Sequence, residues 1–567
     1  MTRLHPALLR HRRSRLPSWH LSILLVAVVI QGGVALWLGS RGWFSGDVLH
    51  YYVERGGAPG GTEGLMEPHA AHWQLVLVVV YLVVFKLVGL TTYVPFIALT
   101  VAVHLVLVLV MYRLLGRLGA SLGASLLCAL ALLTYGAGSE AFIVEAPVAL
   151  TGSLLLGAIA VTQLVGRDFD LRSQRIASVL LLISVMVSLG GVVASVWVGV
   201  FAASRGLGRM VRIVAPPAVA FVAWFVIWGR GDTRVSLEPS EVMQVPEAAW
   251  ALLVAPLDNI TAGWGAGPFL LLLVIVVSVW RAEVRPVLAA ATWAGLVAAM
   301  FHATVSAIAQ VPYGLDQVLT SRYRYVVLVL LLPGLALVLD AFLARASQSL
   351  STYQRRLVLV PGTIVIGSLL LHAALGQYRV ASAVADIGEL TRDLLAGTVV
   401  ATSTGEKVIN DSVRGSYISG EDLERLSSPE LRDELPQLPL TEENRIEAES
   451  QYFVEVAAAD NELGEPASLT SDSFVPRLQM TSGCRTYTAT NATPTLTLTS
   501  FVGAGIRVRT DAGSVTTRLY RPAEDIRGSL VSWIVNPEEW VQISTSAQLA
   551  SLDVTFDSGG SFTICPG

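Results

Sequence analysis

Long apolar runs separated by short polar segments occupy most of the chain before residue 377. The first run, 21–40, would be about 30 Å long as a helix, which equals the thickness of a bilayer core. Ten later runs have the same character, at 93–112, 118–136, 143–165, 177–188, 191–203, 213–228, 267–280, 287–308, 325–343 and 357–376. The pattern predicts a polytopic α-helical membrane protein with about eleven spans within residues 21–377.

The arginines between these runs predict an orientation, because positive charges concentrate on the cytoplasmic side of membrane proteins. The basic segment 1–20 precedes the first run, so we expect a cytoplasmic N-terminus. The first run is longer than the apolar part of a signal peptide and has no cleavage motif after it, so we interpret it as a retained anchor. Five further arginine clusters lie at 113–117, 167–175, 205–212, 281–285 and 345–356.

All of these clusters fall on the cytoplasmic side if the apolar segment 74–89 does not cross the membrane. We therefore interpret 74–89 as a juxtamembrane or re-entrant helix. The chain is then a multi-pass protein of the plasma membrane whose C-terminal region, after an odd number of crossings, lies outside the cytoplasm.

The character of the chain changes after residue 377, where the long apolar runs stop. Residues 378–478 have the pattern of an acidic helical and loop region, and residues 479–567 alternate as strands do. We expect the second part to be a small β-sandwich, so that the extracytoplasmic region is α+β. Cys484 and Cys565 are the two cysteines of this region, and we expect them to form a disulfide.

Composition excludes two broad classes of protein. Hydrophobic residues make up 53% of the chain and charged residues 14%, with a mean hydropathy of +0.60, which is incompatible with a soluble globular chain. The arginines lie at the ends of the apolar runs instead of forming a basic stripe with interleaved aromatics. We therefore expect membrane lipid as a partner and no nucleic acid.

The first external loop, 41–73, collects most of the early polar residues. Asp47 is the candidate general base, because a carboxylate beside a membrane cavity can accept the proton of an attacking hydroxyl. The alternative interpretation is that Asp47 caps a helix that starts near Val48. The two roles are compatible.

The same loop carries candidate substrate contacts. His69 and His72 are three residues apart and share one face if that segment is helical. The residues that we interpret as substrate-binding here are His50, Glu67, His69, His72 and Trp73. A divalent metal held by the two histidines with Glu67 or Asp47 is the weaker alternative, because no third ligand is fixed by the spacing.

A second group of candidates lies at the outer start of a late span. Arg322 and Arg324 lie outside, against the positive-inside trend, and two such arginines favour an anion. With Tyr323 and Tyr325 they form a candidate clamp for a polyprenyl phosphate, and pairing with lipid headgroups, Asp316 or the acidic outer domain is the alternative. Glu140 and Glu145 are candidate acidic residues of the same cavity. His104 and His302 lie within apolar runs, where we expect interhelical hydrogen bonds.

With these features, residues 1–380 resemble the GT-C superfamily of polytopic glycosyltransferases. The resemblance lies in the acidic residue after the first span in Phe44-Ser45-Gly46-Asp47, the long first loop followed by 74–89, and Ser321-Arg322-Tyr323-Arg324-Tyr325 at a helix start. The outer β domain is similar to the carbohydrate-binding modules of actinobacterial cell-envelope enzymes of this group. Many members have two adjacent acidic residues in the first loop, whereas here Asp47 stands alone.

The resemblance implies transfer of a sugar from a polyprenyl-phosphate donor to a cell-envelope glycan acceptor on the outer face of the membrane. A non-catalytic envelope scaffold or glycan-binding protein of the same architecture is the first alternative. A transporter or lipid flippase is the second, and the absence of an obvious inverted repeat in the sequence disfavours it.

Overall fold

The computed structural model describes the chain in two compact units. The first comprises Met1–Gly42, Gly64–Tyr81 and Val94–Val384, and the second Trp43–Glu63, Leu82–Tyr93 and Ala385–Gly567. The residues that the structure describes are 18–44, 46–56, 64–69, 72–144, 146–166, 169–231, 237–261, 263–349, 352–403, 422, 425–426, 441, 444–445, 448 and twelve strands between 454 and 566.

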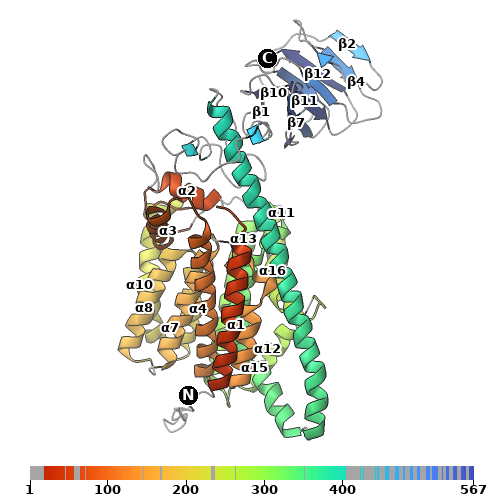
Figure 1. Cartoon of the computed structure of the whole chain (residues 1–567). Coiled ribbons are helices and arrows are strands. Elements are labelled where there is room, and N and C mark those ends of the chain that lie inside the picture. The colour runs from red at the N-terminus through yellow and green to blue at the C-terminus, as the bar shows by residue number, and fades with distance from the viewer. Residues whose placement is uncertain are drawn as a thin grey trace. The chain divides into compact units, whose positions relative to one another are not determined.

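The first unit is a bundle of helices (Figure 1). Its helices are α1 (Ser18–Gly39), α4 (Val94–Leu118), α5 (Leu122–Leu133), α6 (Glu140–Ile143), α7 (Val148–Gly166), α8 (Leu171–Val187), α9 (Gly190–Ala203), α10 (Leu207–Ile227), α11 (Pro239–Ile260), α12 (Gly267–Trp280), α13 (Pro286–Gln310), α14 (Leu315–Val318) and α15 (Ser321–Ser349). Short 3-10 turns lie at η2 (Gly136–Gly138), η3 (Gly229–Gly231) and η4 (Val311–Tyr313). Two helices, α3 (Leu75–Val88) and α16 (Thr352–Ser403), pass from one unit into the other.

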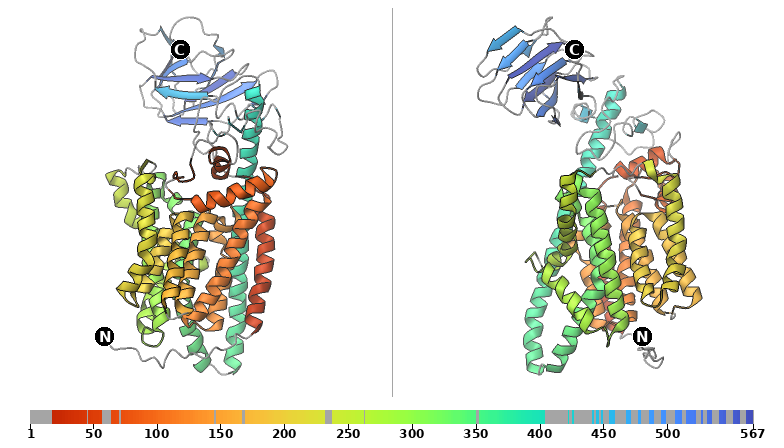
Figure 2. Two further views of the ribbon diagram at one scale, coloured as in Figure 1. Left: turned by 90° about the vertical axis from the view of Figure 1, so that its left-hand side faces the viewer. Right: turned by 180° about the vertical axis from the view of Figure 1, so that it is seen from behind.

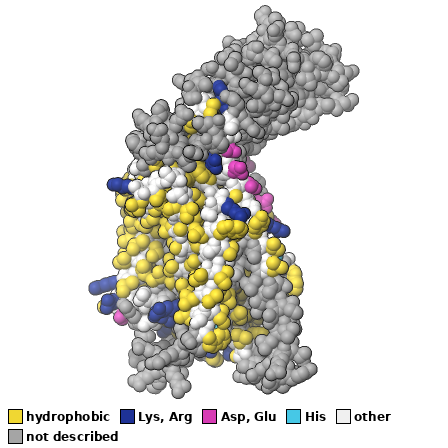
Figure 3. Space-filling view, viewed as in Figure 1, with side chains coloured by type: hydrophobic (Ala, Val, Ile, Leu, Met, Phe, Trp, Pro, Cys, Tyr) yellow, Lys and Arg dark blue, Asp and Glu magenta, His cyan; other side chains and the backbone are white. Residues whose placement is uncertain are grey.

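Six helices within the described part of the chain are long and apolar enough to cross a membrane. They cover Trp19–Gly39, Val94–Leu118, Val148–Gly166, Leu207–Ile227, Pro286–Tyr313 and Ser321–Arg345. Figure 3 shows their hydrophobic side chains as a broad yellow surface over the bundle. The chain is therefore a predominantly helical membrane protein, while the predicted total of about eleven spans stays a prediction.

A helix is present at each of the eleven predicted spans, although several are shorter than a bilayer core. The predicted span 118–136 contains only α5, because Gly119 adopts a left-handed turn (φ 97°) before it and the helix ends at Leu133. The sequence did not predict α11, which contains Pro246 and Pro256 and begins with a polar half. Its first half lacks the continuous apolar run on which the prediction of spans depended.

The segment predicted not to cross forms α3. Fourteen residues of helix extend about 21 Å, which is less than the roughly 30 Å of a hydrocarbon core. Its first half belongs to the first unit, where Tyr81 packs edge-on against Phe96 of α4 with ring centroids 5.4 Å apart. The helix is seen from a second side in Figure 2.

Arginines at the ends of several helices and in the turns between them lie at one end of the bundle, which we call the arginine end. Arg117 donates to the carbonyl oxygen of Thr162 over 2.8 Å, and Arg205 and Arg209 lie over the ring of Phe169. Arg285, directly before α13, and Asp340, within the second half of α15, pair over 3.4 Å. Figure 3 shows dark blue side chains near the lower edge of the hydrophobic surface and others near its upper edge. The clusters that the sequence separates are thus close in space.

The second unit contains α2 (Gly46–Glu54) and two six-stranded sheets among the described residues. The first sheet has the order β1 (Val454–Ala458), β10 (Trp540–Thr545), β6 (Ile506–Thr510), β12 (Ser561–Pro566), β4 (Arg485–Thr488) and β2 (Ala467–Thr470). The second joins β3 (Arg477–Leu478), β5 (Thr495–Leu498), β11 (Ser551–Phe556), β7 (Ser514–Arg521) and β8 (Ile526–Arg527), with β9 (Val531–Ile534) also paired to β7.

Most strand pairs are antiparallel, as the long β7–β11 ladder from Val515↔Phe556 to Tyr520↔Ser551 illustrates. Val515, Thr516, Thr517 and Leu519 on β7 are all buried. Strands β1, β2 and β3 precede residue 479, the predicted start of the β domain, and β1 pairs with β10 of that domain. The packing of the two sheets as a sandwich stays a prediction.

Candidate functional site

Asp47 lies in the first turn of α2, a nine-residue helix directly after the first apolar helix. The helix begins at Gly46, so Asp47 is within the helix and not at the residue before it, where a cap would stand. The helix macrodipole favours a carboxylate in a first turn. Its side chain is exposed, whereas Val48 and Leu49 are fully buried. The buried neighbours hold α2 in place, while the side chain of Asp47 is on its exposed side.

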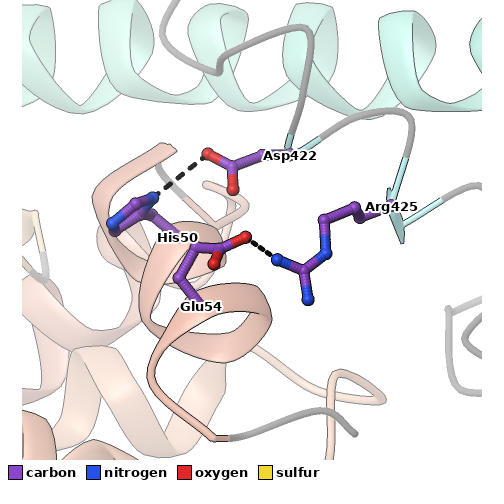
Figure 4. A network of polar contacts seen from close by, with 4 residues as sticks. All are labelled: His50, Glu54, Asp422 and Arg425. Carbon is purple, nitrogen blue, oxygen red and sulfur yellow. Dashed lines mark hydrogen bonds and ion pairs between the residues drawn. The ribbon is translucent and has the colours of Figure 1, made fainter. Parts of the chain in front are cut away.

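Two other polar residues of α2 contact the segment around residue 422 (Figure 4). The Nδ1 atom of His50 lies 3.4 Å from Oδ2 of Asp422, and Arg425 pairs with Glu54. The side chain of Asp422 is 6% exposed and that of Glu54 7%. His50, predicted as a substrate contact, therefore has a partner within the protein.

Asp422 and Arg425 were missed at the level of sequence. His50 and Glu54 are four residues apart on α2, and Asp422 and Arg425 are three apart in the chain. This arrangement sets the His50–Asp422 contact and the Glu54–Arg425 ion pair side by side. The similar spacing of polar residues on α2 and around residue 422 was the available sequence signal. It could not identify these residues as partners, because more than 360 residues separate them in the chain.

The histidine loop, residues 64–69 and 72–73, belongs to the first unit. Hydrogen bonds within the loop and to neighbouring helices hold it in place. His69 and His72 exchange two backbone hydrogen bonds of 3.1 and 2.9 Å. The Nδ1 atom of His72 accepts the backbone N–H of Leu189 over 3.2 Å, so this nitrogen carries no proton. The loop is thereby attached to the start of α9.

Trp73 and Trp224 attach the same loop to α10. Their rings stack with centroids 5.4 Å apart and an angle of 4° between planes, and Trp73 is buried. The indole N–H of Trp224 donates to the carbonyl oxygen of Met66 over 2.7 Å. Glu67 is exposed beside these contacts. Trp73 and His72 thus have structural partners, and their role as substrate contacts stays a prediction.

The start of α15 is a hub whose four predicted clamp residues contact four different helices. Arg322 pairs with Glu140 of α6 over 3.1 Å, and its backbone N–H donates to the same carboxylate. The Tyr325 hydroxyl and Nδ1 of His104 on α4 are 2.7 Å apart, both deeply buried.

The two remaining hub residues have partners on α11 and α13. Arg324 donates to Oδ1 of Asn259 over 3.5 Å, and the hydroxyl of Tyr135 donates to the same oxygen over 3.2 Å. The ring of Tyr323 meets that of His302 edge-on at 5.8 Å. Within the described residues, a carboxylate partner for Arg322 is therefore present in Glu140, which the alternative interpretation of these arginines did not name.

The predicted site residues divide between the two units. Asp47 and His50 belong to the second unit, whereas the histidine loop, Glu140 and the α15 hub belong to the first. Glu145 and Cys484 lie outside the described residues, as does the side chain of Cys565 on β12. The disulfide between the two cysteines stays a prediction. Within the part of the chain that the structure describes, no group of three His, Cys, Asp or Glu residues is arranged to hold a metal ion.

Comparison with known proteins adds no assignment. No protein-family model matches the chain, and neither a curated protein nor a solved structure matches it. Its function must therefore be argued from its own residues.

Proposed function

We propose that this protein is a membrane-embedded glycosyltransferase that uses a polyprenyl-phosphate-linked sugar on the extracytoplasmic face of the plasma membrane, with a cell-envelope glycan as acceptor. The observation that carries the proposal is the exposed Asp47 carboxylate on a helix that follows the first apolar helix and is anchored by buried neighbours. The resemblance of the membrane part to the GT-C superfamily supports the same class of reaction.

The reaction needs only a positioned base. The oxygen of an acceptor hydroxyl attacks the anomeric carbon of the donor sugar and its proton passes to the Asp47 carboxylate. The bond between that carbon and the phosphate oxygen breaks, and the polyprenyl phosphate leaves with the bonding electrons. Because a phosphate is a good leaving group, no separate acid is required, and Asp47 returns its proton to water.

The orientation is part of this proposal. Arginines favour the cytoplasmic side, so the arginine end of the bundle faces the cytoplasm. The opposite end, at which α1 finishes and the chain enters α2, then faces outward. We retain about eleven crossings, with α5, α8, α9, α12 and α16 joining the six long helices, because this number puts every arginine cluster on one side.

An assay of sugar transfer tests the proposed base. Membranes containing wild-type protein, Asp47→Asn or Asp316→Asn are given a panel of labelled polyprenyl-phosphate sugars and envelope glycans. Asp316 is exposed on α14 in the first unit and serves as the matched carboxylate control. We expect Asp47→Asn to lower transfer by about 100-fold or more, as is typical for removal of a general base, and Asp316→Asn to leave it unchanged. Equal transfer by wild type and Asp47→Asn would remove Asp47 from the mechanism.

A second candidate is a non-catalytic glycan-binding protein of the envelope. The Arg322–Glu140 pair favours it, because Glu140 offsets a positive charge that a phosphate clamp would use. The sequence also has one carboxylate at this point of the first loop where many GT-C enzymes have two adjacent ones. Binding of a glycan without transfer from any donor, at equal amounts of folded wild-type protein, would support this second candidate.

A further inference from the structure

The second unit contains a pocket of about 180 Å³ that belongs to none of the predicted sites. It is lined by Trp43, Phe44, Thr91, Thr92, Tyr93 and Arg392, among others. Pockets for drug-sized ligands usually measure about 300–1,000 Å³, so this one has room for a single ring or a group of that size.

Three aromatic rings form one side of the pocket. Phe44 packs edge-on against Tyr93 at 5.4 Å and against Trp43 at 5.5 Å. Phe44 and Tyr93 are buried, at 1% and 5% exposure, whereas Trp43 is half-buried. The indole of Trp43 is thus the ring with surface left to offer, and a broad amphipathic ring suits the apolar face of a sugar.

Arg392 supplies the charge of the pocket. It lies on α16 with an exposed side chain, and no ion pair of this arginine is found among the residues that the structure describes. A guanidinium forms charge-assisted, bidentate hydrogen bonds to phosphates and carboxylates. The threonines next to the rings add hydroxyl groups, of which that of Thr91 donates to the carbonyl oxygen of Val88 over 2.6 Å.

A close backbone approach holds the arginine beside the tryptophan. A Cβ atom at Gly388 would lie 2.6 Å from the backbone nitrogen of Trp43, so only glycine permits this contact. Gly388 and Arg392 are four residues apart and share one face of α16. The helix therefore presents Arg392 toward the segment that carries the indole ring.

We infer that this pocket binds a sugar that carries an anionic group, a phosphate or a carboxylate, with the ring against Trp43 and the anion on Arg392. The inference concerns binding alone and does not depend on Asp47 acting as a base. The sugar can belong to a lipid-linked molecule or to a soluble glycan, since both present the same chemistry to the pocket.

Equilibrium binding to the purified full-length protein in detergent tests this inference by calorimetry. The probes are glucose 1-phosphate, glucuronate, glucose, inorganic phosphate and a geranyl-phosphate-linked glucose. We expect glucose 1-phosphate to bind more tightly than both glucose and inorganic phosphate, because the pocket contacts the ring and the anion together. Tighter binding of the geranyl-linked sugar than of glucose 1-phosphate identifies a lipid-linked source, and weaker or equal binding identifies a soluble one.

Variants separate the two contacts. Arg392→Gln is expected to weaken binding of glucose 1-phosphate by about tenfold or more, given the strength of charge-assisted hydrogen bonds, and to leave that of glucose unchanged. The matched control is Arg379→Gln, an exposed arginine on the same helix, which should have no effect. Trp43→Leu should weaken binding of both sugars, while Trp43→Phe retains most of it.

The inference would be overturned by any of three results in protein that unfolds at the wild-type temperature. The first is that no sugar probe binds, and the second is that inorganic phosphate binds as tightly as glucose 1-phosphate. The third is that Arg392→Gln and Arg379→Gln bind glucose 1-phosphate equally well. Asp47→Asn is included throughout and should bind as wild type does, which keeps failure of this inference distinct from failure of the proposed catalysis.

Discussion

Single residues decide how closely the helices of the bundle approach one another. A Cβ atom at Gly295 on α13 would overlap the carbonyl oxygen of Leu330 on α15, and one at Gly157 on α7 would lie 2.9 Å from the Cβ of Ala194 on α9. Small residues at such crossings allow helix backbones to pack closely where the surrounding lipid gives no hydrophobic driving force. The contact between α13 and α15 is therefore specified by the absence of one side chain.

Gly295→Ala should destabilise the protein for this reason. Backbone atoms cannot move aside as a flexible side chain can, and overpacking of this kind costs about 1–3 kcal/mol. The control is Gly116→Ala on α4, where a Cβ meets nothing within 4 Å and alanine favours the helix by up to about 1 kcal/mol. Thermal unfolding in detergent should give a lower midpoint for Gly295→Ala and an unchanged or higher one for Gly116→Ala. Equal midpoints for both variants would show that the α13–α15 contact is looser than described.

At the scale of elements, α2 is a short helix that depends on its surroundings. Nine residues are too few for a stable isolated helix in water, because nucleation is costly. Its apolar face is buried through Val48, Leu49, Tyr52 and other residues, and the ring of Tyr52 lies 4.9 Å from that of Phe85. The pairs His50–Asp422 and Glu54–Arg425 join its polar face to a distant segment. The element that carries Asp47 is thus positioned by contacts remote in sequence.

A double-mutant cycle of Glu54→Ala and Arg425→Ala should reveal this coupling. Each single change removes one partner of the Glu54–Arg425 pair and leaves the other charge in place, so the double variant should be less destabilised than the sum of the two, by about 1 kcal/mol. Hydrogen exchange of the α2 amides measures the effect locally, since opening of this helix need not unfold the bundle. Strict additivity of the two changes would indicate that the ion pair contributes nothing to the placement of α2.

At the scale of the whole molecule, the proposed membrane arrangement rests on charge and on helix length. The described residues contain six long apolar helices, four shorter apolar helices and arginines gathered at one end of the bundle. Helices such as α9 and α12, each of 14 residues, need protein or a cavity against their ends if they cross. The contacts of α9 with the histidine loop through His72 and Leu189 are of this kind.

Labelling of single cysteines in intact cells tests the proposed topology. In a background without the native cysteines, Ser204→Cys and Ala282→Cys at the arginine end should resist a membrane-impermeant maleimide. Trp264→Cys and Tyr313→Cys, which replace side chains that are 85% and 74% exposed, should react with it. Permeabilised cells should label all four variants. Labelling of the first pair and protection of the second would reverse the orientation, and a mixed pattern would change the number of crossings.

The sequence by itself determined the class of the protein and the positions of its long helices. Hydropathy acts locally, because each apolar residue favours lipid or a protein interior wherever it stands, so a run of such residues needs no information about distant parts of the chain. The same is true of arginines at helix ends. The sequence failed at α11 and at the length of α5, where prolines, glycines and polar residues within a helix are tolerated through packing with neighbours.

Only the tertiary structure decided which polar residues are partners. By their chemistry, the candidates chosen from the sequence included His50, His72, Arg322 and Glu140. In the structure His50 contacts Asp422, His72 accepts a hydrogen bond from Leu189, and Arg322 forms an ion pair with Glu140. It also formed the pocket of Trp43 and Arg392, whose members lie almost 350 residues apart in the chain. A polar side chain needs one specific partner at hydrogen-bond distance, and that distance is set by the packing of whole helices and not by local pattern.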